Sequence, residues 1–361
     1  MVKYTLWNTQ VDIQIPYKPF PSMEEIKEMD SLFPSPLTHG YFPSESTGCQ
    51  LHYRVCLPDK NQDVKGILVF QHGIAAHSGT AFKLSSGRVT NYALLTNSMV
   101  KAGYGVYLLD MYGHGFSEGT RFYVPNSWEV NRDDFHSFAL FAARQHTEDT
   151  PLFLGGDSYG GCLAIHVARQ WQDNPTGAPT GFHGLCLTAP AIVGHLPPPP
   201  VVFVLRRILK PIAPKWTPFF MPNPINPDQI WSDEEVKTIQ TSDRVRRTGL
   251  QASGVPFRLG TANGLVSALE AVREKSIPGL TVPFCVAHGV MDGGVPIEGT
   301  EKYLLAMSST KEEDKSFLKE VDCKHDLMAE PKAEEVVGWI IRWMDGRVGK
   351  GSMFSEAIES K

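Results

Sequence analysis

The chain lacks the excess of positive charge and the long apolar runs that mark nucleic-acid-binding and membrane-spanning proteins. Its 361 residues include 34 Lys and Arg against 39 Asp and Glu, for a net charge of -5. This balance offers no electrostatic footprint for nucleic acid, so we expect no nucleic-acid partner. The longest stretch free of Asp, Glu, Lys and Arg, residues 174–205, holds seven prolines and four glycines, which argues against a transmembrane helix.

Cysteine is scarce, and the spacing of the six cysteines includes no Cys-x-x-Cys pair. Scattered cysteines within apolar runs are typical of buried free thiols in a reducing compartment. The first 20 residues also lack the uninterrupted apolar core of a secretory signal. We therefore expect a cytoplasmic protein, with peripheral contact to membranes left open. His72 and His77 have no carboxylate or thiolate companion nearby in the sequence, so no metal site is predicted.

Apolar residues make up 42% of the chain, enough to build a large core. From about residue 65, short apolar runs alternate with helical stretches. Continuous apolar runs indicate a sheet buried on both faces, and their alternation with helices predicts an α/β fold with a mostly parallel, doubly wound sheet. We predict strands over residues 66–71, 105–110, 151–155, 182–190, 282–289 and 316–322, and helices over residues 89–102, 128–146, 159–171, 297–308 and 333–344.

The alternation stops between residues 195 and 276, where four consecutive prolines open an apolar and then a charged segment. We interpret residues 195–276 as an inserted cap, or lid, over the edge of the sheet where ligands bind. The core then consists of residues 46–194 and 277–350. Residues 1–45 form a separate N-terminal extension, in which a capping box at residues 22–25 predicts one short helix.

Two segments match Gly-x-Ser-x-Gly, around Ser117 and around Ser158. A nucleophilic serine of this type needs a strand entering it and a helix leaving it, because the tight turn must lift the hydroxyl above the edge of the sheet. Ser158 has both a preceding apolar run and a following helical stretch. No helical pattern follows Ser117. We predict Ser158 as the nucleophile and Ser117 as a structural loop residue.

A serine nucleophile needs a base and an orienting acid, which follow the serine in the order acid, then histidine. His325 comes directly after the last predicted strand and is the predicted base, with His195 as the alternative. Asp292 follows the preceding strand and is the predicted acid. Asp322 and Asp326 lie so close to His325 in the sequence that we interpret them as solvated loop residues.

Hydrolysis through a serine also needs two backbone N–H groups aimed at the developing oxyanion. Tyr159 follows the nucleophile directly and supplies the first. The turn after the strand over residues 66–71 is placed to supply the second, with Ile74 as the predicted donor.

Five ordered motifs together resemble the monoglyceride lipase and lysophospholipase branch of the α/β-hydrolases, often catalogued as serine aminopeptidase-like. They are His72-Gly73 with His77-Ser78, the segment over residues 110–119, Gly156-Asp157-Ser158-Tyr159-Gly160, His288-Gly289 with Asp292, and Lys324-His325. The resemblance implies an α/β-hydrolase fold and hydrolysis of a monoacylglycerol or lysophospholipid ester by Ser158, His325 and Asp292. It further implies that the reaction needs no cofactor and takes place under a mobile cap.

The apolar segment over residues 201–210 carries Arg206 and Arg207. One hypothesis is that it lines an acyl tunnel and touches a membrane surface, as interfacial helices do. The alternative is that its apolar face packs on the core. Alternative functions are a small-molecule carboxylesterase, an acyltransferase, and a non-catalytic binder that keeps the hydrolase shell. The sequence leaves the acyl length, the head group and the oligomeric state open.

Overall fold

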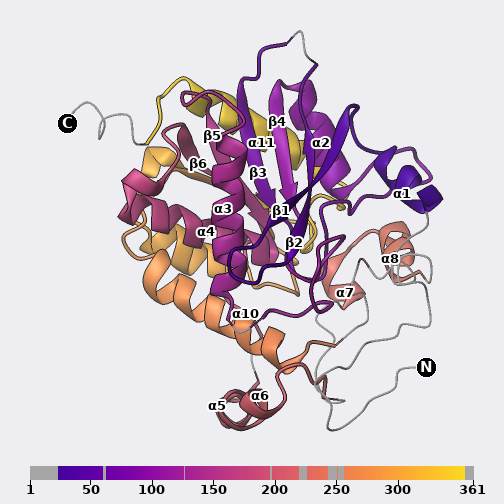
Figure 1. Cartoon of the computed structure of the whole chain (residues 1–361), viewed down its shortest axis with the longest axis vertical. Helices are drawn as coiled ribbons and strands as arrows, with labels where there is room; N and C mark the ends of the chain where they lie inside the picture. The colour runs from indigo at the N-terminus through magenta and orange to yellow at the C-terminus, as the bar shows by residue number, and fades with distance from the viewer. Residues whose placement is uncertain are drawn as a thin grey trace.

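The computed structural model describes residues 23–59, 62–125, 127–195, 197–218, 226–242, 250 and 256–353. An eight-stranded sheet forms the centre of the molecule, with helices on both faces (Figure 1). The strands are β1 (Leu37–Pro43), β2 (Gln50–Cys56), β3 (Gly66–Gln71), β4 (Tyr104–Leu109), β5 (Leu152–Asp157), β6 (Phe182–Thr188), β7 (Phe284–Gly289) and β8 (Lys315–Glu320). This architecture confirms the predicted α/β-hydrolase fold.

The strands lie in the order β1-β2-β4-β3-β5-β6-β7-β8. From β4 to β8 all neighbouring strands are parallel, whereas β2 pairs antiparallel with both β1 and β4. Every residue of β3, β4, β6 and β7 is buried, as the continuous apolar runs predict for a sheet covered on both faces. Because the parallel strands run the same way, the residues that follow them gather along one edge of the sheet.

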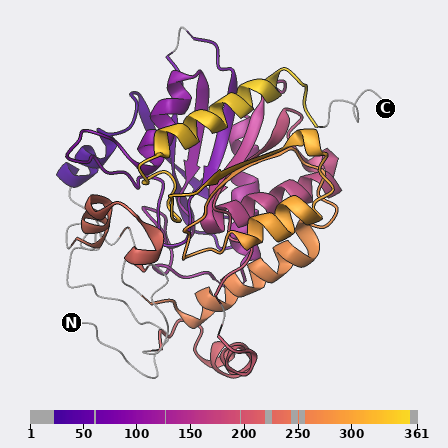
Figure 2. The same cartoon turned by 180° about the vertical axis from the view of Figure 1, so that it is seen from behind.

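Helices on the two faces divide the core into two layers. The helices α3 (Glu129–Ala143) and α4 (Ser158–Asp173) pack on one face, and α2 (Asn91–Lys101) and α11 (Ala333–Val348) on the other. Figure 2 shows α11, in yellow, crossing the face opposite α3 and α4. The remaining core elements are α1 (Met23–Asp30), the short 3-10 helices η1 (Pro175–Gly177) and η5 (Glu312–Asp314), and the π-helical stretch η4 (Thr300–Leu305).

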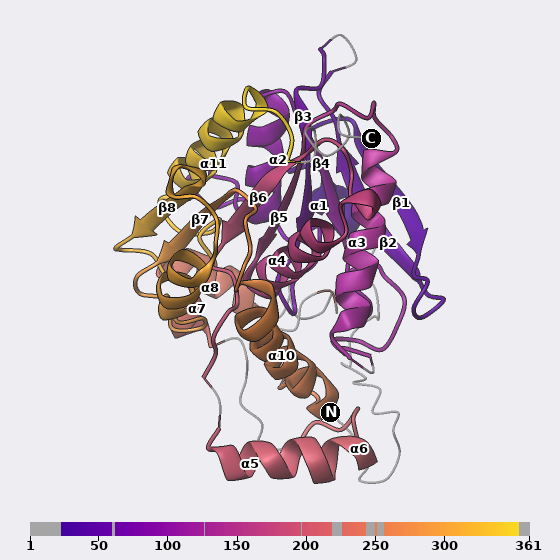
Figure 3. The same cartoon turned by 90° about the vertical axis from the view of Figure 1, so that its left-hand side faces the viewer.

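A cap is inserted between β6 and β7. It contains α5 (Pro199–Val204), the π-helical stretch η2 (Leu205–Leu209), α6 (Lys210–Ile212), α7 (Pro227–Ile230), α8 (Glu234–Thr241), α10 (Leu259–Ala271) and the π-helical stretch η3 (Val272–Ser276). Figure 3 shows α5 and α6 as one helix that stands apart from the sheet on the far side of α10. The α7 and α8 helices instead lie beside the sheet (Figure 1).

Two strands, β1 and β2, were not anticipated from the sequence. In β1, exposed and half-exposed residues replace an apolar run, because this strand lies at the edge of the sheet with only β2 beside it. The strand falls within residues 1–45, so the N-terminal extension contributes both the short helix α1 and an edge strand to the core. Of the helix predicted over residues 297–308, the central part is the π-helical stretch η4.

The structure also bears on the thiols and on membrane spans. All six cysteines lie in the described residues and none forms a disulfide; five are buried and Cys49 is partly exposed. Across the described ranges, no helix combines the length and the apolar character needed to cross a membrane.

Candidate active site

Ser158 lies at the point where β5 ends and α4 begins, with its backbone in the left-handed region at a φ of 52°. A non-glycine residue rarely adopts this conformation, and it is the strained turn that lifts a serine above the edge of a sheet. Backbone atoms at the end of β3 approach this turn closely. A Cβ at Gly160 would lie 2.1 Å from the carbonyl oxygen of Gln71, so only glycine fits there.

Asp292 and His325 come together from the loops after β7 and β8. The Nδ1 of His325 lies 2.7 Å from Oδ2 of Asp292 and donates a hydrogen bond to it. The other oxygen, Oδ1, accepts hydrogen bonds from the backbone N–H groups of Gly294 and Val295, both at 2.8 Å. The Asp292 side chain is fully buried, and hydrogen bonds to both of its oxygens fix its orientation.

Charge and burial shift the pKa of both members of this pair. Burial alone would raise the pKa of Asp292, but the charge of His325 and hydrogen bonds from His288 and His325 lower it well below its usual range. Burial alone would lower the pKa of His325, but the carboxylates of Asp292, Asp157 and Asp326 outweigh burial and raise it. A carboxylate that stays ionised beside a histidine holds the imidazole with its Nε2 free to accept a proton.

The two residues predicted to supply backbone N–H groups, Ile74 and Tyr159, both line the cavity that contains Ser158. Tyr159 lies in the first turn of α4, where a backbone N–H has no intrahelical acceptor. Ile74 lies in the turn after β3, in which Ala76 N–H bonds to the carbonyl of Gly73 and Ala75 has a φ of 66°. The Ile74 N–H has no hydrogen-bond acceptor among the described residues. Both groups are thus available to an anion.

A cavity of about 440 Å³ connects these residues with the cap. Ser158, His325, Ile74 and Tyr159 line one part of it. The cap contributes mainly apolar side chains, from α5 and η2 (Val202 and Leu205) and from α10 (Leu265, Val266 and Leu269). The cavity can therefore hold an apolar group next to the serine hydroxyl.

Two further carboxyls, those of Asp157 and Asp326, line this cavity, and the surroundings of neither were predicted from the sequence. Burial and the nearby carboxylate of Asp326 raise the pKa of Asp157 to about 7, and Asp157 accepts a 2.9 Å hydrogen bond from the hydroxyl of Tyr92. The prediction that Asp326 is a solvated loop residue is wrong. Its oxygens accept hydrogen bonds from Nδ2 of Asn91, at 2.9 and 2.8 Å, and from Nε1 of Trp231, at 2.9 Å. Asp322, in contrast, is 80% exposed.

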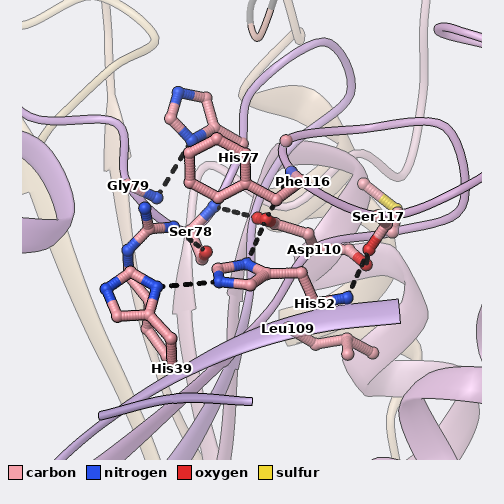
Figure 4. A network of polar contacts seen from close by, with 12 residues as sticks. His39, His52, His77, Ser78, Gly79, Leu109, Asp110, Phe116 and Ser117 are labelled. Carbon is pink, nitrogen blue, oxygen red and sulfur yellow. Dashed lines mark hydrogen bonds and ion pairs between the residues drawn. The ribbon is translucent and has the colours of Figure 1, made fainter. Parts of the chain in front are cut away.

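Ser117 occupies a different, structural network (Figure 4). Its hydroxyl donates to the backbone carbonyl of Asp110 at 2.6 Å and accepts from the backbone N–H of His52 at 2.8 Å. The Asp110 carboxylate accepts from Nδ1 of His52 at 2.7 Å and from the N–H groups of Ser78 and Phe116 at 2.5 and 3.0 Å. The Ser117 side chain is buried and fully engaged, as expected of a structural loop residue.

The other histidines that follow Ser158 in the sequence have different surroundings. His195, the predicted alternative base, lines the same cavity but is exposed. His166 is buried between Ser276 and the carbonyl of Ala268. His183 bonds to the carbonyl of Gly181. Within the described part of the chain, no group of three or more His, Cys, Asp or Glu side chains is arranged to hold a metal ion.

The exposed cap helix has two unlike faces. Arg206 points toward α10, where its guanidinium donates to both oxygens of Glu270, at 2.8 and 2.9 Å, and to Ser267 at 2.8 Å. Arg207 is exposed. The outward face is apolar, with exposed fractions of 60% for Phe203 and 67% for Ile212, beside Val201, Val204 and Ile208.

The sheet topology, the serine elbow and the buried acid–histidine contact define the α/β-hydrolase class. The chain belongs to the family described as serine aminopeptidase, S33 (Hydrolase_4), whose model matches residues 62–332. This match confirms the α/β-hydrolase resemblance stated from the motifs.

Curated relatives and solved structures agree with this assignment. The chain is 25% identical over 297 residues to a monoacylglycerol lipase of Mycolicibacterium smegmatis, covering 82% of this chain and 93% of that protein. It is 26% identical over 293 residues to a caffeoylshikimate esterase of Arabidopsis thaliana, covering 80% of each. The crystal structure of the Paleococcus ferrophilus monoacylglycerol lipase matches the fold with a TM-score of 0.63 at 20% identity, over 86% of this chain and 99% of that one.

Proposed function

We propose that this protein is a serine hydrolase that cleaves the carboxylic ester of a monoacyl lipid, a monoacylglycerol or a lysophospholipid. Ser158 is the nucleophile, His325 the general base and Asp292 the orienting acid. The observation that carries the proposal is the strained elbow at Ser158, which opens onto the same cavity as the His325 ring held by Asp292. The relatives named as monoacylglycerol lipase and esterase support it.

The reaction follows from these roles. Nε2 of His325 takes the proton of Ser158 while the hydroxyl oxygen attacks the ester carbonyl. The N–H groups of Ile74 and Tyr159 stabilise the oxyanion, each worth about 3 kcal/mol in the barrier. The imidazolium then gives its proton to the departing alcohol, which leaves an acyl group on Ser158. A water molecule, deprotonated by His325, releases the fatty acid and restores the serine.

The apolar cap side of the cavity supports an acyl chain as the group that is bound. Each buried CH₂ contributes about 0.8 kcal/mol, so a long chain gains on the order of 10 kcal/mol before the entropy costs of binding. A short ester such as an acetyl ester gains little from this cavity.

We assign residues 195–276 as the cap and residues 46–194 and 277–350 as the core, to which the N-terminal extension adds α1 and the edge strand β1.

Replacing Ser158 by Ala tests the nucleophile. We expect Ser158→Ala to lose hydrolysis of monooleoylglycerol and labelling by a fluorophosphonate probe, while Ser117→Ala, in the same type of motif, keeps both in the folded protein. Turnover retained by Ser158→Ala would overturn the mechanism. No labelling of the unmodified protein would favour a non-catalytic binder.

A chain-length series of p-nitrophenyl esters, beside monoacylglycerol and lysophosphatidylcholine, tests the substrate class. We expect long acyl chains to be preferred, and Leu265→Trp, which fills the cap side of the cavity, to lose that preference while keeping turnover of the acetyl ester. A preference for acetyl esters in the unmodified protein would point to a small-molecule carboxylesterase. Product analysis with a competing alcohol would detect acyl transfer.

We also propose that the outward face of the α5–α6 helix touches a membrane surface, where such a substrate is found. The exposed Phe203 and Ile212 support this contact, and Arg207 adds positive charge beside them. Because a buried side chain of this size contributes about 1.5–3 kcal/mol, Phe203→Ser with Ile212→Ser should lower flotation with phosphatidylcholine and phosphatidylserine liposomes by more than about tenfold. Met307→Ser, at an exposed apolar residue outside the cap, is the matched control. Equal flotation of all three proteins would contradict membrane contact.

The unpaired thiols support a cytoplasmic location.

A further inference from the structure

Residues 228–233 of the cap lie directly against the two loops that carry Asp292 and His325. The carbonyl of Gln229 accepts a hydrogen bond from the N–H of Gly293 at 3.2 Å. The carbonyl of Ile230 accepts from the N–H groups of both His325 and Asp326, at 3.1 and 3.2 Å. Two consecutive cap carbonyls therefore connect the loop of the acid with the loop of the base.

Side chains reinforce this junction on the histidine loop. The indole Nε1 of Trp231 donates to Oδ2 of Asp326 at 2.9 Å, and Asn91 donates to both oxygens of the same carboxylate. The ammonium of Lys324 donates to the carbonyl of Asp228 at 2.6 Å. The residues on both sides of His325 are thus held by the cap.

Packing and a second polar cluster secure the same segment. Ile230 and Trp231 are 8% and 4% exposed and pack with Leu84 and Ala329. Ser232 donates to the carboxylate of Glu330 through its N–H, at 2.7 Å, and through its hydroxyl. Arg88 joins the cluster by bonding to Asp233 at 3.1 Å and to the carbonyl of Glu330 at 2.7 Å.

The other part of the cap is held differently. The α5–α6 helix stands apart from the sheet (Figure 3) and is tied to α10 through Arg206 and Glu270. Its outward face is exposed. The cap therefore consists of one part built into the loops of the catalytic residues and another that faces solvent.

We propose that residues 228–233 are a positioning element for the catalytic pair, in which Trp231 acts through Asp326 to hold the loop of His325. This inference rests on the proposed function, because it assigns His325 the role of base. The cap thus helps to build the catalytic centre, in addition to covering the substrate.

The charged groups around His325 also predict how the pH dependence of the activity should change when one of them is removed. The imidazole is faced by Asp292 from the loop after β7, by Asp157 from the end of β5 and by Asp326 from its own loop. The Tyr92 hydroxyl, from α2, bonds to Asp157, and Glu330 lies near Asp326. Since each of the three carboxylates raises the pKa of His325, removing the charge of Asp326 should lower that pKa.

The test compares Trp231→Phe with Trp171→Phe. Each substitution removes one indole hydrogen bond. Trp231 donates to Asp326 at 2.9 Å, and Trp171 donates to His136 at 2.8 Å. Trp171 is the matched control because it is buried on α4 about 20 Å along the helix from Ser158. We expect Trp231→Phe to lower kcat for a soluble ester, and the rate of fluorophosphonate labelling, between about tenfold and a hundredfold with little change in KM. Trp171→Phe should keep the kcat of the unmodified protein.

A second variant, Asp326→Asn, removes the charge but keeps the size of the side chain. We expect the acid limb of its kcat/KM profile to move to lower pH, whereas the limb of Trp171→Phe stays in place. Unchanged kcat and labelling in Trp231→Phe, or an equal loss in Trp171→Phe, would overturn the inference. If the unmodified protein itself fails to react with the probe, the proposed function fails instead, so the two failures are distinguishable.

Discussion

Replacing Asp292 by Asn tests the catalytic pair most directly. Oδ1 accepts two backbone hydrogen bonds, from Gly294 and Val295, and an asparagine carbonyl oxygen can keep both. Oδ2 accepts from Nδ1 of His325 at 2.7 Å and from Nε2 of His288 at 3.1 Å. The amide NH₂ of Asn would be a donor at this position, so His325 must turn its ring or place its proton on Nε2.

A proton on Nε2 prevents His325 from accepting the proton of Ser158. The same exchange in a serine protease triad lowers kcat by about 10⁴-fold, and we expect a loss of that order here. At about 1.4 kcal/mol for each factor of ten, this corresponds to roughly 5.5 kcal/mol in the barrier. The substitution keeps the volume of the side chain and half of its hydrogen bonds, so the fold should survive.

The assay is steady-state hydrolysis of a soluble ester, together with thermal unfolding to show that the variant is folded. Asp322→Asn is the matched control, because Asp322 lies three residues from His325 in the sequence and is 80% exposed. We expect this control to keep the kcat of the unmodified protein. A folded Asp292→Asn variant with more than about a tenth of that kcat would refute the orienting role of Asp292.

Further predictions concern the elbow and the buried network of Figure 4. Gly160→Ala would place a Cβ 2.1 Å from the carbonyl oxygen of Gln71, so both the melting temperature and kcat should fall. Gly346 lies on α11, where a Cβ meets nothing within 4 Å, so Gly346→Ala should stabilise the protein by about 0.5–1 kcal/mol. Thermal unfolding of the two variants decides between these outcomes. Burial alone would raise the pKa of Asp110, but its hydrogen bond with His52 and the charges of His52 and Arg54 hold that pKa well below its usual range. Its stabilising contribution is therefore complete above the unfolded pKa of about 3.9 and is lost as the pH falls below it. Urea unfolding between pH 6 and pH 3 should show a flatter decline for Asp110→Asn than for the unmodified protein, and parallel declines would contradict this account.

The strands and helices that flank the cavity could be predicted because their signals are local. Continuous apolar runs mark β3 to β7, and a glycine-rich turn between a strand and a helix marks the position of Ser158. The edge strand β1 could not be predicted in this way. It has few buried residues, and its stability depends on pairing with β2, which no local pattern reveals.

The environment of Asp326 shows the same limit within the site. In the sequence it is an acidic residue beside a histidine in a loop, and solvent exposure is the natural expectation. Its partners Asn91 and Trp231 lie 235 and 95 residues away, and only folding brings them to its carboxylate. The inward turn of Arg206 likewise depends on Glu270, which lies 64 residues further along the chain.

The sequence by itself determined the fold class, the family and the elbow at Ser158, because periodicity, turn glycines and short motifs act over a few neighbouring residues. Motif order also predicted Asp292 and His325 as acid and base, but only the tertiary structure shows that the two side chains, 33 residues apart, meet at 2.7 Å. The tertiary structure also decided that one part of the cap is joined to their loops while another exposes an apolar face. Contacts of this kind arise where separate loops converge at the edge of the sheet, so their distances and burial exist only in the folded chain.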